Sequence, residues 1–302
     1  MIIRLVLVFS YPFDNTTRFG WSSLVVTKII YIPDRMCLTP DFETAVMQKA
    51  RAKLESLFIS VKMPESHGLS HCLTVLGNME KTIASSAEVH RPLLTPDRLL
   101  TLRLAALLHE ADDHKYFKTS SNFENAKQIC EEVIPDSLET KQTIISEVVK
   151  MISLVSASAN GNSVPEVART DPTFLWPRYC DRLESIGVVG AVRCYQYSLE
   201  SKEKLMVETT PRPTTEQELW AEVKEERWSK YQTGGGQSES MMDHYYDKLL
   251  HIGKFDPSVV RSEYLQDEAK RRVQPLVDIC LEAGRSGQPP LESLNKLKMS
   301  IS

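Results

Sequence analysis

Apolar residues recur at helical spacing through most of the chain, from Thr39 to Ala283. One set that shares a helix face at intervals of three and four residues is Leu69, Leu73, Leu76 and Met79. Thr39 and Thr95 are each followed by Pro and Asp, a pattern typical of an N-cap with proline in the first helical turn. The spacing predicts an all-α fold, a helical bundle in which each helix buries its apolar face.

The run Leu99–Leu108 (LLTLRLAALL) is apolar nearly all round, so we expect a central, buried helix there. Residues 39–284 are predicted to form a single helical domain. Ahead of it, residues 1–38 are expected to be a short irregular or β-like extension, because the run Leu24–Ile32 is rich in Val, Ile and Tyr. Residues 285–302 are expected to be a flexible tail.

The composition is ordinary for a globular domain, with 42% hydrophobic and 25% charged residues among 302. A net charge of −4 argues against general binding to nucleic acid. The apolar start, Met1–Phe9, is interrupted by Arg4 and is far shorter than the ~20 residues of a membrane span, so no membrane partner is expected. Six cysteines without a CxxC pair are typical of free thiols, which favours a cytoplasmic location.

Histidine and acidic side chains occur beside apolar helical stretches in three separated fragments. These are His71 in SHGLSHCLTV, His109 and Glu110 in LLHEADDHKYF, and Asp181 in RYCDRLESIGVV. Two imidazoles and carboxylates that helix packing brings together form a site for one divalent metal ion. Such donors suit Mn²⁺, Fe²⁺, Co²⁺, Ni²⁺ or Zn²⁺, and Mg²⁺ less well because of the two nitrogens. We expect Mn²⁺ first.

Each histidine also has a simpler interpretation. A histidine on an apolar helix face more often bonds a backbone group than a metal, and this holds for His67 taken alone. The order and surroundings of the three fragments favour a metal site. Glu110 directly follows His109, so the two side chains diverge on an ideal helix and reach one ion only if the helix ends there. The segment Ala111–His114 lacks apolar periodicity, which is consistent with such an end.

These fragments resemble the HD-domain metal-dependent phosphohydrolases, especially the bacterial subgroup that cleaves nucleoside triphosphates. SHGLSH is similar to that subgroup's His-Asp-x-x-His opening, with Gly68 in place of Asp, His71 as the metal-binding histidine and His67 as the accessory one. LLHEADDHKYF, CDRLESIGVVGAVRCYQY and SMMDHYYDKLLHIGKF resemble three later segments. The resemblance covers about residues 39–283 and implies an HD-type helical bundle. The chain has Glu110 where the family name specifies Asp.

The resemblance implies a set of metal ligands, namely His71, His109, Glu110 and Asp181. It implies metal-assisted hydrolysis of a phosphoester or phosphoanhydride by an activated water. Glu110 and Asp113 are then the expected catalytic carboxylates, with Asp113 positioning or deprotonating the water. A local helix-capping role is the alternative for Asp113.

Five further residues are expected to contact a small phosphate substrate. Lys115 and Arg182 are candidate phosphate donors, because a polyanion needs positive charge beside the carboxylates. A solvated lysine and an interhelical ion pair are the competing interpretations. His244 and Lys248 lie four residues apart on one face of the late helix, which packs over the metal site in the resembling family. His67 completes the set.

Three functions fit these patterns. The first is a nucleotide pyrophosphohydrolase or phosphatase. The second is a dinuclear iron oxygenase, which is disfavoured because only His114 lies between His109 and Asp181. The third, motivated by Glu110, is a degenerate HD domain that binds a nucleotide or a protein partner without turnover. The sequence leaves open whether the chain forms a homodimer.

Overall fold

The helix caps predicted at two threonines are present. Thr39 Oγ1 accepts a hydrogen bond from the backbone N–H of Phe42 at 3.2 Å. Thr95 Oγ1 accepts one from the backbone N–H of Arg98 at 3.3 Å. Each cap satisfies a backbone donor that the first helical turn leaves unpaired, so local sequence determines where both helices begin.

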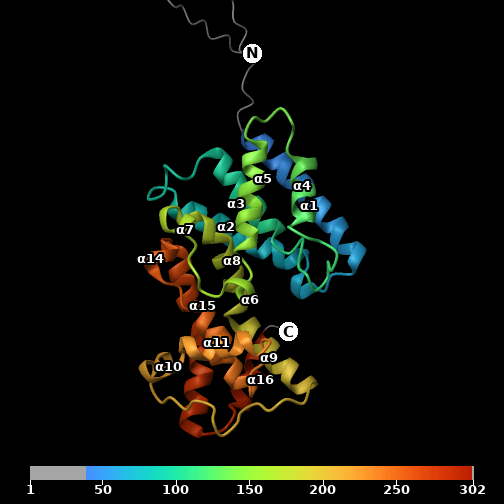
Figure 1. Ribbon diagram of the computed structural model, residues 1–302. Helices are drawn as coiled ribbons and strands as arrows, with labels where there is room; N and C mark the ends of the chain where they lie inside the picture. The colour runs from blue at the N-terminus through green and yellow to red at the C-terminus, as the bar shows by residue number, and fades with distance from the viewer. Residues whose placement is uncertain (1–38, 301–302) are drawn as a thin grey trace, which may run out of the picture. The chain divides into compact units, whose positions relative to one another are not determined.

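The computed structural model describes residues 39–300, in which every regular element is a helix (Figure 1). The first elements are α1 (Pro40–Val61), η1 (Glu65–His67), α2 (Leu69–Ser86), α3 (Pro96–Leu108), α4 (Glu124–Val133), α5 (Lys141–Ser153), α6 (Ala157–Asn160), α7 (Glu166–Thr170), η2 (Pro172–Leu175) and α8 (Trp176–Ser185). The later elements are α9 (Val188–Glu200), α10 (Glu216–Glu222), α11 (Glu225–Thr233), α12 (Met241–His244), η3 (Tyr245–Leu249), α13 (Leu250–Ile252), α14 (Pro257–Val260), α15 (Glu263–Ser286) and α16 (Leu291–Ser300).

The predicted all-α class is confirmed, since the described residues contain no strand. The extension predicted for residues 1–38 lies outside the described residues. Among residues 39–300, none of the helices combines the length and the apolar character that a membrane crossing requires.

α3 is the central helix that its apolar sequence predicts. It packs against α1, α2, α5 and α8 and lies among them in Figure 1. Leu100, Leu104 and Leu107 are among its fully buried side chains. Since α2 and α8 carry two of the candidate metal ligands, this packing brings them close to the C-terminal end of α3.

A second apolar cluster is built from α9 and the helices that follow it. Tyr245 and Tyr246 are fully buried in this cluster. The long helix α15 connects it to the first cluster. Leu265 and Ala269, near the start of α15, belong to the first cluster, and Leu276 belongs to the second. α15 therefore holds the late helices against the part of the domain that carries the candidate ligands.

The expected flexible tail from residue 285 is wrong for most of its length. α15 continues to Ser286, and α16 then packs against α9. Leu294 on α16 is completely buried, and Tyr195 Oη donates a hydrogen bond to Asn295 Oδ1 at 3.3 Å. The reason is local: leucines at three-residue intervals in LESLNKLK give this segment an apolar face.

Candidate metal centre

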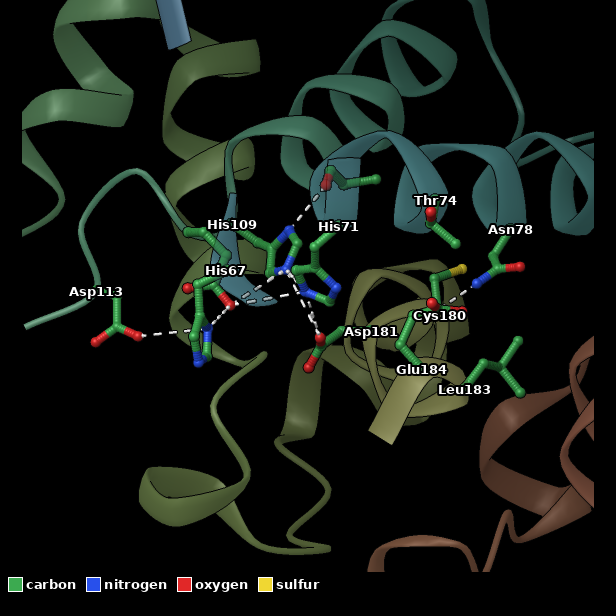
Figure 2. A network of polar contacts seen from close by, with 12 residues as sticks. His67, His71, Thr74, Asn78, His109, Asp113, Cys180, Asp181, Leu183 and Glu184 are labelled. Atoms are coloured by element: carbon green, nitrogen blue, oxygen red, sulfur yellow. Dashed lines mark hydrogen bonds and ion pairs between the residues drawn. The ribbon is translucent and has the colours of Figure 1, made fainter. Parts of the chain in front are cut away.

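Three elements deliver the four predicted ligands to one point (Figure 2). His71 stands on the first turn of α2, and Asp181 stands in the middle of α8. His109 and Glu110 directly follow α3. One ligand atom from each of the four residues lies within 4.8 Å of the others. Side chains from distant parts of the sequence therefore form a single cluster.

The candidate ligand atoms of the four residues lie close together. His71 Nε2 lies 3.1 Å from His109 Nε2 and 3.2 Å from Asp181 Oδ1. Glu110 Oε1 lies 3.7 Å from each of these two imidazole nitrogens. Around an ion with bonds of ~2.0–2.2 Å, neighbouring ligand atoms are about 3–4 Å apart. The four residues therefore have both the chemistry and the spacing of a divalent metal site.

A backbone carbonyl fixes the orientation of one imidazole. His109 Nδ1 lies 2.9 Å from the carbonyl oxygen of Ala106, where only an N–H can make the bond. Neutral His109 is therefore protonated on Nδ1, and the lone pair on Nε2 points toward His71 and Asp181. Metal-binding histidines characteristically donate their second N–H in this way.

The electrostatics of the cluster also favour a cation. Burial alone would lower the pKa of His109, but the nearby carboxylates of Asp181 and Glu110 raise it to about 9. Burial would raise the pKa of the Asp181 carboxyl, but hydrogen bonds from His109 in its charged form, which carries a proton on both nitrogens, and from His71 hold it below its usual range. Asp181 is thus ionised, and the negative charge of the cluster attracts either protons or a metal ion.

The helix end that the sequence required at this point is present. α3 ends at Leu108, and His109 is its C-cap residue. The backbone N–H of Ala111 bonds the Leu108 carbonyl in the turn that follows. Because Glu110 lies in this turn and not on the helix, its carboxylate reaches the same point as the His109 ring. The predicted helix end is confirmed, and His109 and Glu110 belong to one group of side chains that could hold a metal ion.

A second group of ligand types adjoins the first. His67, on η1, has its Nδ1 atom 3.1 Å from Glu110 Oε1 and 4.0 Å from Asp113 Oδ2. One ligand atom from each of these three residues lies within 4.8 Å of the other two. The rings of His67 and Tyr116 are also in contact, with centroids 5.6 Å apart. His67 and Asp113 were predicted in separate roles, and the fold brings them together beside Glu110.

Arg182 does not have the predicted access to phosphate. Its side chain is 1% exposed, and Nη1 donates a hydrogen bond to Asn162 Oδ1 at 2.7 Å. Nη2 donates to the carbonyl oxygen of Gly161. The guanidinium is therefore committed to the loop after α6, and a structural role replaces the predicted substrate contact. The competing interpretation, an interhelical ion pair, is also replaced, because these partners are uncharged.

Lys115 and Lys248 provide positive charge near the cluster. Lys115 is exposed. The pKa of Lys248 is lowered by burial and by the charge of Lys115, while Asp181 opposes this shift. Lys248 therefore interacts electrostatically with both Asp181 on α8 and Lys115 in the loop after α3. It belongs to η3, a single turn of π-helix, and such turns occur often at functional sites.

His244 precedes this π-helical turn and packs against Tyr231, with ring centroids 5.4 Å apart. Burial and the neighbouring charge of Lys248 lower its pKa to about 4. His244 is therefore neutral near pH 7.

Comparison with known proteins shows a viral relative. The chain is 32% identical over 233 residues to the uncharacterized protein L803 of Acanthamoeba polyphaga mimivirus, which covers 73% of this chain and 89% of the viral protein. This chain belongs to the family of L803. No family model matches the chain. A Lactobacillus plantarum protein of known crystal structure, a structural-genomics target, is 19% identical and covers 83% of this chain and 99% of its own, with a TM-score of 0.48.

The sequence patterns did not identify Asp112, whose hydrogen bonds hold the loop after α3 in place. Its two carboxylate oxygens accept hydrogen bonds from the backbone N–H groups of Asn125 and Ala126, each at 2.9 Å. Asn125 Nδ2 in turn donates to the Ala111 carbonyl at 2.8 Å. These bonds tie the loop to the start of α4. The two adjacent aspartates signal an acidic loop, but nothing in their order distinguishes Asp112 from Asp113.

Proposed function

We propose that this chain is a metal-dependent phosphohydrolase of the HD-domain type. Its substrate is a nucleotide or another small phosphate ester or anhydride. The observation that carries this proposal is the convergence of His71 Nε2, His109 Nε2, Glu110 Oε1 and Asp181 Oδ1, with the His109 tautomer fixed by a backbone carbonyl. The resemblance of the surrounding segments to HD phosphohydrolases supports the same reaction class.

The residues of the cluster have different roles in the proposed reaction. His71, His109, Glu110 and Asp181 hold one divalent ion, with Mn²⁺ as the first choice. When bound, the ion supplies Lewis acidity toward a phosphate oxygen and lowers the pKa of a water. The Asp113 carboxylate faces the same space from the loop after α3, where it orients that water and accepts its proton. Its own position is held by the Lys115 N–H, which donates to Asp113 Oδ1 at 2.9 Å.

Positive charge for a polyanionic substrate comes from two lysines. Lys115 is exposed in the loop after α3, and Lys248, on η3, interacts electrostatically with Lys115 and Asp181. A phosphate group bound to the ion lies between carboxylates, so fixed positive charge lowers the energy of the complex and of the transition state. Neutral His244, four residues before Lys248, adds a hydrogen-bonding group. Arg182 has no part in this proposal because its guanidinium is buried elsewhere.

The test is hydrolysis of a panel of nucleoside triphosphates and small phosphate esters by the protein loaded with Mn²⁺. Wild type is compared with Asp181→Ala, which removes a ligand. Glu184→Gln is a matched control, because Glu184 stands on the same helix but pairs with Arg272 outside the cluster. Thermal melting of each variant confirms that it is folded.

We expect wild type and Glu184→Gln to release phosphate or pyrophosphate, and Asp181→Ala to show only background. Pyrophosphate would place the cut at the α-phosphorus. Equal turnover by Asp181→Ala, or no turnover by wild type with any of the divalent ions named above, would refute the proposal. Nucleotide binding without turnover would favour the degenerate, ligand-binding HD domain.

A further inference from the structure

Glu110 stands between two groups of ligand atoms. On one side, its Oε1 atom lies 3.7 Å from the Nε2 atoms of His71 and His109. On the other side, the same oxygen lies 3.1 Å from His67 Nδ1. Asp113 completes this second side. A carboxylate in this position can bridge two ions.

The distance between His67 and Asp113 is compatible with a shared metal ion and excludes a direct hydrogen bond. His67 Nδ1 and Asp113 Oδ2 are 4.0 Å apart, which is too long for a hydrogen bond. Two atoms that each bind one ion at ~2.1 Å are separated by about 3–4 Å, and the pair falls at the upper end of that interval. Because the Lys115 N–H occupies Asp113 Oδ1, Oδ2 is the oxygen left to face His67.

The solvent access and the ligand types of the second group also suit a metal ion. The side chains of His67, Glu110 and Asp113 are 28%, 12% and 14% exposed, so the second group is open to solvent on one side. Water can therefore complete the coordination of an ion there. One imidazole and two carboxylates suit Mn²⁺, Fe²⁺ or Co²⁺.

We propose that His67, Asp113 and Glu110 bind a second divalent ion and that Glu110 bridges it to the first. Two-metal hydrolytic sites place their ions about 3.5–4 Å apart, a separation that one carboxylate can span. The extra methylene of Glu110 relative to Asp lets its carboxylate extend toward His67. Any catalytic role of the second ion rests on the proposed hydrolysis. In that reaction Asp113 would act on the water as a ligand of the second ion. The binding itself does not depend on turnover.

The test is the number of ions per chain. The full chain is freed of metal, equilibrated with Mn²⁺, separated from excess ion and analysed by elemental analysis and electron paramagnetic resonance. Wild type is expected to hold about two ions with a spin-coupled Mn²⁺ signal, as in two-metal sites. His67→Ala and the isosteric Asp113→Asn are each expected to hold about one, with an uncoupled signal. His114→Ala is the control, because His114 is in the same loop but 85% exposed and outside the ligand group.

One ion in wild type, or two coupled ions in both variants, would overturn the second site. The second site would be supported if His114→Ala keeps two ions while His67→Ala and Asp113→Asn each lose one. The readout does not require substrate, so its outcome is separate from that of the hydrolysis test. A protein with two coupled ions and no phosphohydrolase activity would keep this inference and refute the proposed function.

Discussion

At the scale of single residues, Asn162 links two buried side chains and determines the state of both. Arg182 Nη1 must donate to its oxygen, so the amide Nδ2 points the other way and donates to His251 Nε2 at 3.1 Å. His251 therefore accepts a hydrogen bond and is neutral. Its ring also stacks on Trp228, with centroids 4.7 Å apart and an interplanar angle of 4°. A chain of contacts thus runs from α8, through the loop after α6, to α13 and α11.

The first prediction concerns Arg182. Replacing it with Ala leaves Asn162 Oδ1 and the Gly161 carbonyl without their donors and creates a cavity. We expect the free energy of unfolding to fall by about 2–4 kcal/mol. Lys115→Ala is the comparison, because Lys115 is exposed, and it should change stability by no more than about 0.5 kcal/mol. Urea denaturation measures both, and equal stability of the two variants would contradict the structural role of Arg182.

The second prediction is acid sensitivity that originates at His251. Burial, then the charges of Lys254 and Arg182, lower its pKa from 6.5 to about 4. Because the unfolded chain binds a proton more readily, stability is full above pH 6.5 and is lost as the pH falls toward 4. The loss amounts to about 3 kcal/mol.

Urea denaturation between pH 7 and pH 4 measures this effect. His244 has a similarly lowered pKa, so wild type alone does not isolate His251. The comparison with His251→Gln does, because the variant lacks only one titrating group. We expect His251→Gln to be less stable at pH 7 but to lose less stability on acidification. Parallel pH profiles would show that His251 does not titrate differently in the folded and unfolded chains.

The sequence was informative about the candidate ligands and uninformative about the partners of buried charged side chains. His71, His109, Glu110 and Asp181 were predicted from the order of three fragments rich in His and acidic residues and from their resemblance to HD phosphohydrolases. Arg182 was predicted as a phosphate donor from its charge alone, and its actual partners are a carbonyl and an amide from a distant loop. Those partners depend on tertiary packing, which no local pattern encodes.

At the scale of elements, helix ends determine the site more than helix interiors do. The end of α3 at Leu108 allows His109 and Glu110 to face one point. Interior patterns predicted the helices of the N-terminal half well, because their apolar spacing is regular. Later in the chain, the helical spacing that continues to Ala283 does not reveal the break at Arg261, which has a φ of 47° and separates α14 from α15. Ser262 then caps α15, a short polar signal that the strong apolar pattern around it concealed.

The third prediction tests whether α16 is part of the core. Leu294 is completely buried against the second apolar cluster, whereas Leu291 at the start of the same helix is 49% exposed. Leu294→Ala should lower the free energy of unfolding by about 2–4 kcal/mol, and Leu291→Ala should lower it by less than about 1 kcal/mol. Thermal or urea denaturation measures the difference. Equal, small effects would mean that α16 is not docked and that a flexible tail is the better description.

At the scale of the whole molecule, the candidate metal centre joins parts of the chain that are far apart in sequence. His71 stands on α2, His109 and Glu110 follow α3, and Asp181 stands on α8. In the unfolded chain these ligands are dispersed, so an ion binds the folded state almost exclusively. Ligand binding that is specific to the folded state raises its stability by mass action.

The fourth prediction follows from this linkage. With Mn²⁺ at about one hundred times its Kd, the free energy of unfolding should increase by about 2.7 kcal/mol. For a domain of this size that corresponds to a rise in Tm of roughly 5–10 °C. A chelator should reverse the rise. Asp181→Ala should show little response, because it lacks the carboxylate that contacts both imidazoles at 3.2 and 3.6 Å.

Glu184→Gln separates this effect from nonspecific binding of ions to an acidic protein. Glu184 is on the same helix as Asp181 but pairs with Arg272, so its variant should keep the full metal response. A rise in Tm that is equal in wild type and Asp181→Ala would mean that Mn²⁺ binds elsewhere. A response confined to proteins with an intact cluster would instead show that the ion holds α2, α3 and α8 together, which is the arrangement on which any chemistry at this site depends.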